Sequence, residues 1–454
     1  MNESHGSDTA KAPDFAALLG RFEKTTARIG IIGMGYVGLP LAIACLRGGF
    51  QTIGFDVDET KIEALNAGRS YIKHISGDSI AIFRAGGKFS STTDFSGLAA
   101  MDAIIICVPT PLAEDRGPDL GYVVSSTETI AKHLRTNQLV ILESTTYPGT
   151  TAEVMRPILE RGGLKSGHDF YLAYSPERED PGNPTHETKT IPKVVGGDGA
   201  HALKLALALY DRIVVETIAV SSLDTAEAVK LTENIFRSVN IALVNELKLI
   251  YGKMGIDIWE VIDAAKSKPF GYMPFYPGPG LGGHCIPIDP FYLTWRARQF
   301  GQDTRFIELA GEINTAMPVH VVDVLANELN RRFGKTLAGS KVLVMGIAYK
   351  KNIDDVRESP AFTILDLLEE RGAQTAYYDA HADVIPKTRD HMALAGRRSV
   401  PWTPEALGEY DAALIVTDHD DVDYGALVRE CRLVVDCRNA TRHITEGRDK
   451  IVMA

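Results

Sequence analysis

The segment Gly33-Met-Gly35-Tyr-Val-Gly38 restricts the possible folds of this chain more than any other stretch. It directly follows a short apolar run at Arg28–Ile32 and opens a helical pattern at Leu39–Arg47. At such a strand–turn–helix junction, Gly33 permits the tight turn and Gly35 lets a pyrophosphate approach the backbone. Gly38 allows the helix and the strand to pack closely. The segment therefore predicts a dinucleotide-binding unit, although three spaced glycines alone are weak evidence.

An acidic residue at the end of the second predicted strand strengthens this prediction. Asp56 follows Thr52–Phe55 and lies 18 residues after Gly38. A carboxylate at that place binds a ribose diol and repels the additional phosphate of NADP. The sequence therefore favours NAD as the cofactor, with Tyr36 and Val37 of the glycine turn among its predicted contacts.

Short apolar runs alternate with helical patterns over residues 28 to about 217, which predicts a doubly wound α/β sheet of parallel strands joined by helical crossovers. The clearest strands are Arg28–Ile32, Thr52–Phe55, Ala103–Val108, Val140–Glu143 and Tyr171–Tyr174. The expected helices are Leu39–Arg47, Glu59–Asn66, Val123–Leu134 and Thr151–Arg161, after a short leader helix at Phe15–Phe22. A second alternating stretch has strands at Lys341–Gly346, Gln374–Tyr378, Ala412–Val416 and Leu433–Asp436 and a helix from Ser359-Pro360 to Gly372.

One long helix is predicted between the two alternating stretches. Ser222 is its expected N-cap, and Gly252 or Gly255 lies near its end at about Lys253. Its apolar residues cover more than one narrow stripe, which is typical of a helix buried between domains or subunits.

The predicted fold class is α/β, with two Rossmann-like doubly wound domains joined by a long central helix and a helical middle domain. The expected boundaries are 1–27 for a leader, 28–220 for the NAD-binding domain, 221–320 for the central helical domain and 321–454 for the second Rossmann-like domain.

Charge and cysteine content exclude several classes of protein. A formal net charge of -11 argues against a general nucleic-acid binder, which needs a basic surface. The five cysteines contain no CxxC pair, so no metal site is expected, and Cys45 and Cys107 lie in apolar runs typical of core thiols. No run of about 18 apolar residues occurs, and residues 1–27 lack the apolar region of a secretory signal. A cytoplasmic protein without membrane contact is therefore expected.

The most unusual stretch lies between Phe275 and Pro290. Four glycines and two prolines fall within residues 277–283, and His284 and Cys285 follow at once. Such a backbone is suited to wrapping a ligand and presenting a thiol. A lone cysteine in a loop is more often incidental than catalytic, so these residues alone leave the role of Cys285 open.

Polar residues on the long helix are further candidates. Lys230, Asn234 and Arg237 are spaced so that they share one face. A solvated stripe is the simpler explanation, whereas a buried lysine and amide could stabilise an oxyanion.

Three loops at predicted strand ends also carry candidate residues, because ligands bind at the carboxyl ends of strands in such sheets. Thr110 and Thr146 lie in two of them, where ordinary turn chemistry is an equally good explanation. Glu177 lies in the third and could be a general base, but Glu179 and Asp180 are equally well placed by sequence alone.

Taken in order, these motifs closely resemble those of the UDP-glucose/GDP-mannose dehydrogenase family. The resemblance runs from Arg28 to about Arg438 and is carried by GMGYVG, VPTP, ESTTYPGTT, YSPERxxPG, KLTEN, PGPGLGGHC and GIAYKKNIDDVRESP. It implies a four-electron oxidation of the C6 alcohol of a UDP-sugar by two NAD⁺ without a metal. Cys285 would capture the aldehyde as a thiohemiacetal, and a second oxidation would leave a thioester that water hydrolyses.

The resemblance also implies a role for each matching residue. Lys230 and Asn234 would stabilise the oxyanion, Asp289 would assist water activation and position Lys230, and Glu177 would be the general base, with Thr146 supporting the catalytic water. The remaining NAD contacts would be Lys61, Thr110, Thr146 and Arg357. The UDP-sugar would be bound by Glu177, Arg178, Lys230, Asn234, Arg237, Tyr276, Gly280, His284, Tyr349, Lys350 and Arg438. The second Rossmann-like domain would hold the UDP, and the long helix would form the core of a homodimer or higher homo-oligomer.

Departures from the UDP-glucose pattern bear on the sugar. The UDP-glucose enzymes carry an arginine upstream of the cysteine loop, roughly where this chain has Pro269. PFGYMPFYPGPGLGGHCIPIDPFYL and TENIFRSVNIALVNEL resemble UDP-N-acetylhexosamine 6-dehydrogenases, and YSPEREDPGNP and IPKVVGG favour the UDP-N-acetylglucosamine type. Arg237 and His284 are then candidates for recognising the hexosamine, in an enzyme of polysaccharide biosynthesis.

Other functions remain open alternatives. The same chemistry on UDP-N-acetylmannosamine comes first, followed by UDP-glucose or UDP-galactose. An inactive nucleotide-sugar-binding protein is a different class, and the joint presence of Cys285, Lys230, Asn234, Asp289 and Glu177 argues against it. A two-electron 2-hydroxy-acid dehydrogenase would have no use for the thiol or for a third domain.

Overall fold

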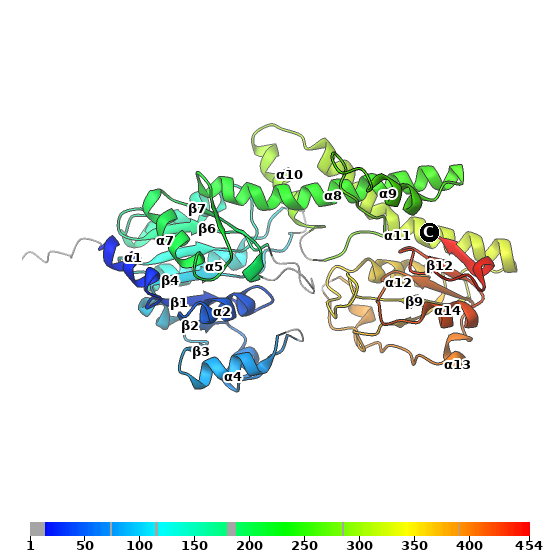
Figure 1. The fold of residues 1–454 in the computed structure, drawn as a ribbon, viewed down its shortest axis with the longest axis horizontal. Coiled ribbons are helices and arrows are strands. Elements are labelled where there is room, and N and C mark those ends of the chain that lie inside the picture. Colours follow the sequence, from blue (N-terminus) through cyan, green and yellow to red (C-terminus); the bar gives the residue numbers. More distant parts are fainter. Residues whose placement is uncertain (1–13, 73–74, 114–116, 179–187, 284–285, 389) are drawn as a thin grey trace, which may run out of the picture. The chain divides into compact units, whose positions relative to one another are not determined.

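The computed structural model describes residues 14–72, 75–113, 117–178, 188–283, 286–388 and 390–454. The chain divides into two compact units, Met1–Thr232 and Glu233–Ala454, and each is described by itself (Figure 1). No helix within the described ranges is long and apolar enough to cross a membrane.

The first unit is built on a sheet with the strand order β3-β2-β1-β4-β5-β6-β7-β8. Its strands are β1 Arg28–Ile32, β2 Gln51–Phe55, β3 Phe89–Thr92, β4 Ala103–Ile106, β5 Leu139–Leu142, β6 Tyr171–Tyr174, β7 Lys193–Gly197 and β8 Thr217–Ala219. Its α-helices are α1 Phe15–Glu23, α2 Gly38–Arg47, α3 Glu59–Asn66, α4 Gly77–Ala85, α5 Gly121–His133, α6 Arg156–Leu159 and α7 Ala200–Tyr210. Shorter helical segments are η1 Phe95–Ala100, η2 Thr150–Met155, η3 Glu160–Gly162 and η4 Thr188–Thr190.

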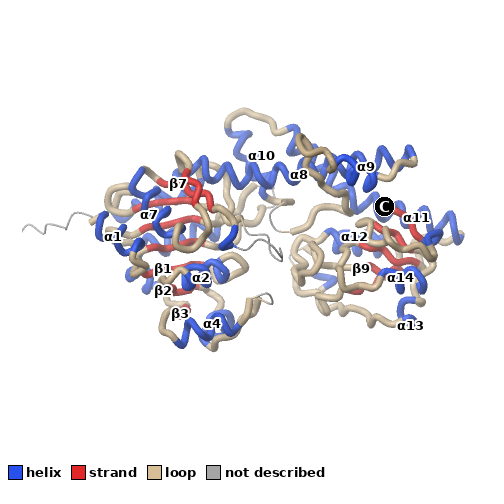
Figure 2. Tube along the Cα trace, viewed as in Figure 1, coloured by secondary structure: helices blue, strands red, loops and turns tan. Residues whose placement is uncertain are grey.

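Both faces of this sheet are buried, and alternate residues of the strands separate the two cores. Ile29 and Ile31 of β1 pack in one core with residues of α1, α2 and α7. Ile104 and Ile106 of β4 pack in the other core with residues of α5. Figure 2 shows helices beside the strands of this sheet. Burial on both faces explains why the central strands are apolar throughout rather than alternating.

Two predictions for this unit are wrong in detail. All pairings were expected to be parallel, but β7 runs antiparallel to β6, with Ala173 opposite Gly197. A parallel neighbour needs a crossover connection, and the described residues between β6 and β7 contain no α-helix to provide one. The helix predicted at Thr151–Arg161 is instead a π-helix, η2, followed by α6 and η3. Strands β3, β7 and β8 and helices α4 and α7 were not predicted.

Helix α8, Leu223–Met254, is the long helix that the sequence predicts. The Ser222 hydroxyl accepts a hydrogen bond of 3.1 Å from the backbone N–H of Thr225, which confirms the predicted N-cap. Gly255 follows the helix in a left-handed conformation with φ of 71°, so it is this glycine that ends it.

The second unit contains a smaller parallel sheet with the strand order β10-β9-β11-β12-β13. Its strands are β9 Lys341–Met345, β10 Gln374–Tyr378, β11 Ala412–Ile415, β12 Val434–Asp436 and β13 Ile451–Met453. Its other helices are α9 Ile258–Ala265, α10 Asp289–Gln299, α11 Arg305–Phe333, α12 Pro360–Glu370, α13 Pro404–Leu407 and α14 Tyr424–Glu430, with η5 Met392–Leu394 and η6 Arg448–Lys450. The predicted α/β fold class, with two Rossmann-like sheets and a long helix, is confirmed. The domain boundaries given above stay a prediction.

The two sheets share one local design at the end of their second strand. The Asp56 carboxylate, after β2, accepts a hydrogen bond of 2.8 Å from the Met34 N–H, just beyond β1. The Asp379 carboxylate, after β10, accepts one of 2.6 Å from the Ile347 N–H, just beyond β9. Asp379 also binds the buried His419 ring at 3.1 Å, so its oxygens are occupied within the protein.

Candidate active site

The glycine turn between β1 and α2 leaves room where a pyrophosphate would lie. Gly33 has φ of 92°, which L-residues with a side chain rarely adopt. A Cβ at Gly38 would lie 1.9 Å from the Gly33 carbonyl oxygen, so only glycine fits there. A Cβ at Gly35 would meet nothing within 4 Å, and Val37 gives the first turn of α2 no side-chain cap. Open space beside a helix N-terminus fits a dinucleotide phosphate.

Asp56 is held at the position of a ribose-binding acid. Its carboxylate accepts hydrogen bonds from the backbone N–H groups of Met34 at 2.8 Å and Asp58 at 3.0 Å. Lys61 Nζ lies 3.3 Å from Asp56 Oδ2, so the predicted NAD contact Lys61 is beside the predicted ribose acid. Tyr71 donates its hydroxyl to the Met34 carbonyl and thereby fixes the glycine turn from the other side. These residues fit NAD.

Two strand-end loops are tied together at the same edge of the sheet. The Ser144 hydroxyl accepts a hydrogen bond from Val108 N–H at 3.0 Å and donates one to the Val108 carbonyl at 2.7 Å. Thr110 Oγ1 donates to the Thr145 carbonyl at 2.8 Å. The adjacent Thr146 hydroxyl is fully buried and has no hydrogen-bond partner among the described residues. A buried polar group of this kind needs a water or a ligand, which agrees with the role predicted for Thr146.

Glu227 of α8 holds the loop that follows Thr146. Its carboxylate accepts hydrogen bonds from Gly149 N–H at 2.7 Å, from Thr151 N–H at 2.9 Å and from the Thr151 hydroxyl at 2.6 Å. Burial raises the pKa of Glu227 to about 7, although these donors oppose the shift. The side chain is completely buried, so it positions the loop rather than binding a ligand.

Glu177 follows β6 and faces a buried lysine. Glu177 Oε1 accepts a hydrogen bond of 2.7 Å from the Arg178 N–H, and Glu177 Oε2 lies 3.7 Å from Lys193 Nζ. The Arg178 guanidinium donates to the Pro192 carbonyl at 2.6 Å. The Glu177 side chain is 14% exposed, so most of it is buried. The alternatives Glu179 and Asp180 lie outside the described residues.

The three residues predicted to share one face of α8 differ in their exposure to solvent. Lys230 and Asn234 are buried, whereas Arg237 is exposed. The Asn234 amide donates a hydrogen bond of 2.6 Å to Asp289 Oδ2, and the Asp289 side chain is buried at the start of α10. The solvated stripe that the spacing left open is therefore wrong for Lys230 and Asn234.

The glycine loop packs against two predicted substrate residues. A Cβ at Gly282 would lie 2.8 Å from Tyr349 Cβ, and one at Gly283 would lie 2.9 Å from Tyr349 Cε2. A Cβ at Gly278 would lie 2.5 Å from Arg438 Nη1, and the same guanidinium donates from Nε to the Val416 carbonyl at 2.8 Å. The glycines are thus required by close packing against side chains as well as by turns. His284 and Cys285 lie outside the described residues.

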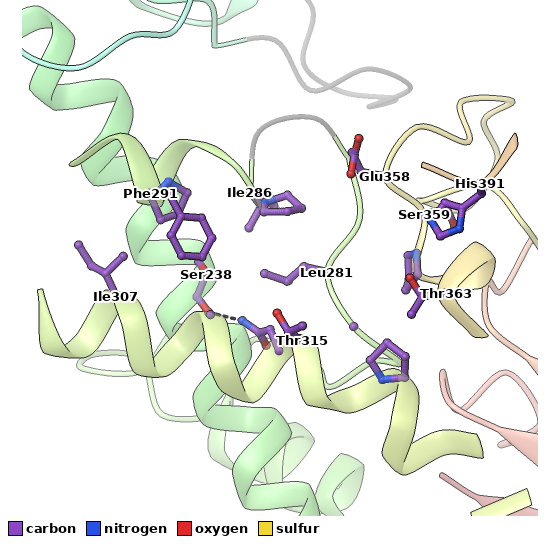
Figure 3. Close-up of a pocket in the computed structure, with 17 residues that line it drawn as sticks. Ser238, Leu281, Ile286, Phe291, Ile307, Thr315, Glu358, Ser359, Thr363 and His391 are labelled. Carbon is purple, nitrogen blue, oxygen red and sulfur yellow. Dashed lines mark hydrogen bonds between the residues drawn. The ribbon is translucent and has the colours of Figure 1, made fainter. Parts of the chain in front are cut away.

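A cavity of the second unit borders this loop on both sides of residues 284–285 (Figure 3). Leu281 precedes these two residues and Ile286 follows them, and both side chains line the cavity. Asn314 of α11 also lines it and donates to the Ser238 carbonyl at 3.1 Å. The cavity is lined by apolar residues such as Leu281, Ile286 and Phe291 and by polar residues such as Asn314 and Glu358.

The remaining predicted contacts lie in several local environments. Tyr276 is 41% exposed and donates its hydroxyl to Asp263 at 2.7 Å. Gly280 adopts φ of 138°, and Lys350 is half-buried after β9. Arg357 belongs to the second unit and pairs with Asp355 through two guanidinium nitrogens. Their predicted roles stay predictions.

Sequence reasoning missed four buried residues that support these loops. They are Glu143, Lys193 and Tyr210, which form one hydrogen-bonded cluster, and Glu227. A charged residue directly at a strand end, as at Glu143 and Lys193, was the available signal. Cys45 and Cys107 are buried as expected.

Together, the sheet, the glycine turn and Asp56 define an NAD-dependent dehydrogenase. Residues 27–214, 224–316 and 343–443 match the NAD-binding, central and UDP-binding domains of the UDP-glucose/GDP-mannose dehydrogenase family. The chain belongs to this family and is an NAD-dependent nucleotide-sugar 6-dehydrogenase, an oxidoreductase whose substrate is a UDP-sugar. The family, enzyme class and cofactor predicted from the sequence are confirmed.

Individual relatives carry two different sugar names. The chain is 35% identical over 398 residues to a UDP-N-acetyl-D-glucosamine 6-dehydrogenase of Pseudomonas aeruginosa, covering 87% of this chain and 91% of the relative. It is 34% identical over 426 residues to a UDP-N-acetyl-D-mannosamine dehydrogenase of Pyrococcus horikoshii, covering 92% and 97%. A solved structure of a UDP-D-ManNAc dehydrogenase from Pyrococcus horikoshii superimposes with a TM-score of 0.83 at 32% identity, covering 94% of this chain and 98% of that one.

Proposed function

We propose that this enzyme oxidises the C6 alcohol of UDP-N-acetyl-D-glucosamine to the carboxylate through a thioester on Cys285. The overall reaction converts one alcohol, one water and two NAD⁺ into one carboxylate, two NADH and three protons. NAD⁺ bound at the glycine turn would supply the hydride acceptor for each of the two oxidations. The observation that carries the proposal is the buried hydrogen bond between Asn234 and Asp289, four residues after Cys285.

This hydrogen bond fixes an oxyanion donor. Because Asp289 accepts from one N–H of the Asn234 amide, this hydrogen bond favours one orientation of the amide and so directs its second N–H. When the Cys285 thiolate adds to the aldehyde carbon, negative charge develops on the former carbonyl oxygen. A fixed amide and the neighbouring Lys230 stabilise that charge at little reorganisation cost.

Glu177 acts in the last step. Its carboxylate takes a proton from water, the water oxygen bonds to the thioester carbon, and the carbon–sulfur bond breaks with its electron pair left on Cys285. The Thr146 hydroxyl, which has no hydrogen-bond partner among the described residues, suits a place beside this water.

The choice of sugar rests on sequence features, because the relatives carry both names at nearly equal identity. Pro269 stands where the UDP-glucose enzymes have an arginine, and the segments around Glu177 and Lys193 favour the N-acetylglucosamine type. UDP-N-acetylmannosamine is the second candidate, favoured by the Pyrococcus horikoshii relative.

We also infer that α8 pairs with a second copy of the chain. Phe236, Leu243 and Ile250 lie seven residues apart on α8 and are 47%, 49% and 47% exposed. Side chains this apolar at such spacing form one stripe along a helix, which is the arrangement of an association surface.

A substrate panel tests the proposed sugar. UDP-N-acetylglucosamine, UDP-N-acetylmannosamine, UDP-glucose and UDP-galactose are each incubated with enzyme and NAD⁺, and NADH absorbance is followed. We expect kcat/KM for UDP-N-acetylglucosamine to exceed every other value by at least about tenfold. A higher value for any other member of the panel would assign the sugar to that member.

A further inference from the structure

A buried lysine that the proposed chemistry does not use lies behind Glu177. Lys193 is the first residue of β7, and only 4% of its side chain is exposed. Its ammonium lies 3.0 Å from Glu143 Oε2 and 3.7 Å from Glu177 Oε2. It also donates to the Pro176 carbonyl at 3.4 Å. One cation therefore serves two carboxylates, one of which is the proposed general base.

Glu143 anchors this lysine. It follows β5, its side chain has no exposed surface, and Oε1 accepts a hydrogen bond of 2.5 Å from the Tyr210 hydroxyl. Burial raises the pKa of Glu143 to about 7, although Lys193 opposes the shift. Burial also lowers the pKa of Lys193, but the two carboxylates more than offset this and raise it overall. Lys193 is therefore a charged ammonium through the neutral pH range.

Three further ionisable groups among the described residues of this cluster are uncharged. Burial raises the pKa of Tyr210, Cys107 and Cys45, so all three are neutral near pH 7. Arg178 presents its backbone N–H to Glu177 Oε1 and directs its guanidinium to a backbone carbonyl. The two oxygens of Glu177 are thus oriented differently, Oε1 toward a backbone donor and Oε2 toward the ammonium.

We propose that Lys193 is a positioning residue for Glu177, keeping its carboxylate ionised and correctly turned for taking a proton from water. This inference rests on the proposed role of Glu177. A general base must be ionised before it can act, and an opposite charge within about 4–6 Å favours the ionised form. Lys193 interacts with Glu143 as well as with Glu177. Its interaction with Glu177 therefore orients the carboxylate but leaves it able to take a proton.

The test compares the pH dependence of kcat in four variants, with UDP-N-acetylglucosamine and NAD⁺ as substrates. Lys193→Met removes the charge, and Lys193→Arg retains it. Glu143→Gln leaves the lysine with Glu177 alone and keeps an acceptor for the Tyr210 hydroxyl. Lys193→Met leaves Glu143 buried without its cation, which can destabilise the fold. The double variant Glu143→Gln/Lys193→Met removes both charges, so its effect on catalysis can be measured apart from an effect on folding. Thermal unfolding of each variant is measured in parallel.

We expect the acid limb of the kcat profile to move up by about one pH unit or more in Lys193→Met and in the double variant, with KM for the UDP-sugar nearly unchanged. Slow hydrolysis should also produce a burst of NADH approaching two per active site before the steady state. Lys193→Arg should restore the wild-type limb, and Glu143→Gln should leave it nearly in place, because Glu143, with its pKa of about 7, is already largely protonated at acid pH.

A double variant that folds like the wild type and keeps its acid limb would overturn the proposal. If Lys193→Met and the double variant do not fold, Lys193→Gln, which removes the charge but keeps an N–H donor for Glu143, is measured in their place. An acid limb that stays in place in this variant overturns the proposal as well, and an upward shift supports it. A wild-type enzyme that oxidises no sugar of the panel would instead refute the proposed function. Full activity in Glu177→Gln would refute the assignment of the base.

Discussion

The amide of Asn234 donates a hydrogen bond of 2.6 Å to the carboxylate of Asp289, joining α8 to the first residue of α10 inside the second unit. Both side chains are buried, with 5% and 2% exposed. The bond fixes the direction of an amide that sequence spacing alone could only place on a helix face.

Loss of this amide should slow the reaction without weakening substrate binding. For Asn234→Ala we expect kcat to fall about 10²–10³-fold, the usual cost of removing one oxyanion donor, with KM nearly constant. Steady-state kinetics of NADH formation measure both constants. Asn240→Ala is the matched control, because Asn240 lies on the same helix and its amide binds only the Phe236 carbonyl among the described residues. Equal kcat values for the two variants would contradict the role of Asn234.

Glu227 should make stability depend on pH. Its folded pKa of about 7 lies above its ordinary value of 4.5. The carboxyl therefore stabilises the fold fully below pH 4.5, and this contribution is lost as the pH rises through about 7, at up to about 1.4 kcal/mol per pH unit. Glu227→Gln removes the titration. Urea unfolding of both proteins from acid to neutral pH should show the wild type losing stability relative to the variant, and parallel curves would exclude the effect. Glu63→Gln, on the exposed face of α3, is the control.

Two substitutions in the glycine turn should have different effects, one on NAD binding and the other on folding. Gly35→Ala places its Cβ in open space, so the protein should unfold at the wild-type temperature but bind NAD more weakly, by about tenfold or more. Gly38→Ala would collide with the Gly33 carbonyl and should destabilise the unit by several kcal/mol. Calorimetric unfolding and NAD titration check both variants. Unchanged NAD affinity in Gly35→Ala would place the pyrophosphate elsewhere.

Helix α8 should carry the subunit contact. Leu243→Asp puts a charge in the exposed apolar stripe and should convert an oligomer into a monomer, as measured by light scattering after size exclusion. Glu246→Gln, one turn further along at an exposed position, should leave the mass unchanged. A wild-type chain that is already monomeric would refute the inferred pairing.

Much of the fold could be predicted because the local hydrophobic patterns of the sequence match the residues that are buried in the structure. β1 and β6, which are short and mostly apolar, and β10, which ends in two tyrosines, begin and end where the sequence predicts. The antiparallel β7 was not predictable, because pairing direction depends on the path of a connection and not on strand composition. The π-helix η2 depends on a carboxylate, Glu227, that is remote in sequence.

The site was predictable in its motifs but not in its supporting residues. The glycine turn and Asp56 follow a spacing rule, and the structure places them accordingly. Lys193 and Glu143 lie 50 residues apart, and only the order of β5, β6 and β7 in the sheet brings them to Glu177. Sequence spacing contains no information about that order.

A four-electron oxidation through Cys285 fixes the ratio of NADH formed to sugar consumed, and this ratio can be measured. A limiting amount of UDP-N-acetylglucosamine is converted completely, NADH is measured by absorbance, and the sugar product is identified by mass spectrometry. We expect two NADH per sugar, a uronic acid product and no free aldehyde. Cys285→Ser should bind NAD and the UDP-sugar but form no acid, whereas the control Cys431→Ser, at a buried position, should behave as the wild type. One NADH per sugar with released aldehyde, or acid formation by Cys285→Ser, would contradict the four-electron oxidation through Cys285.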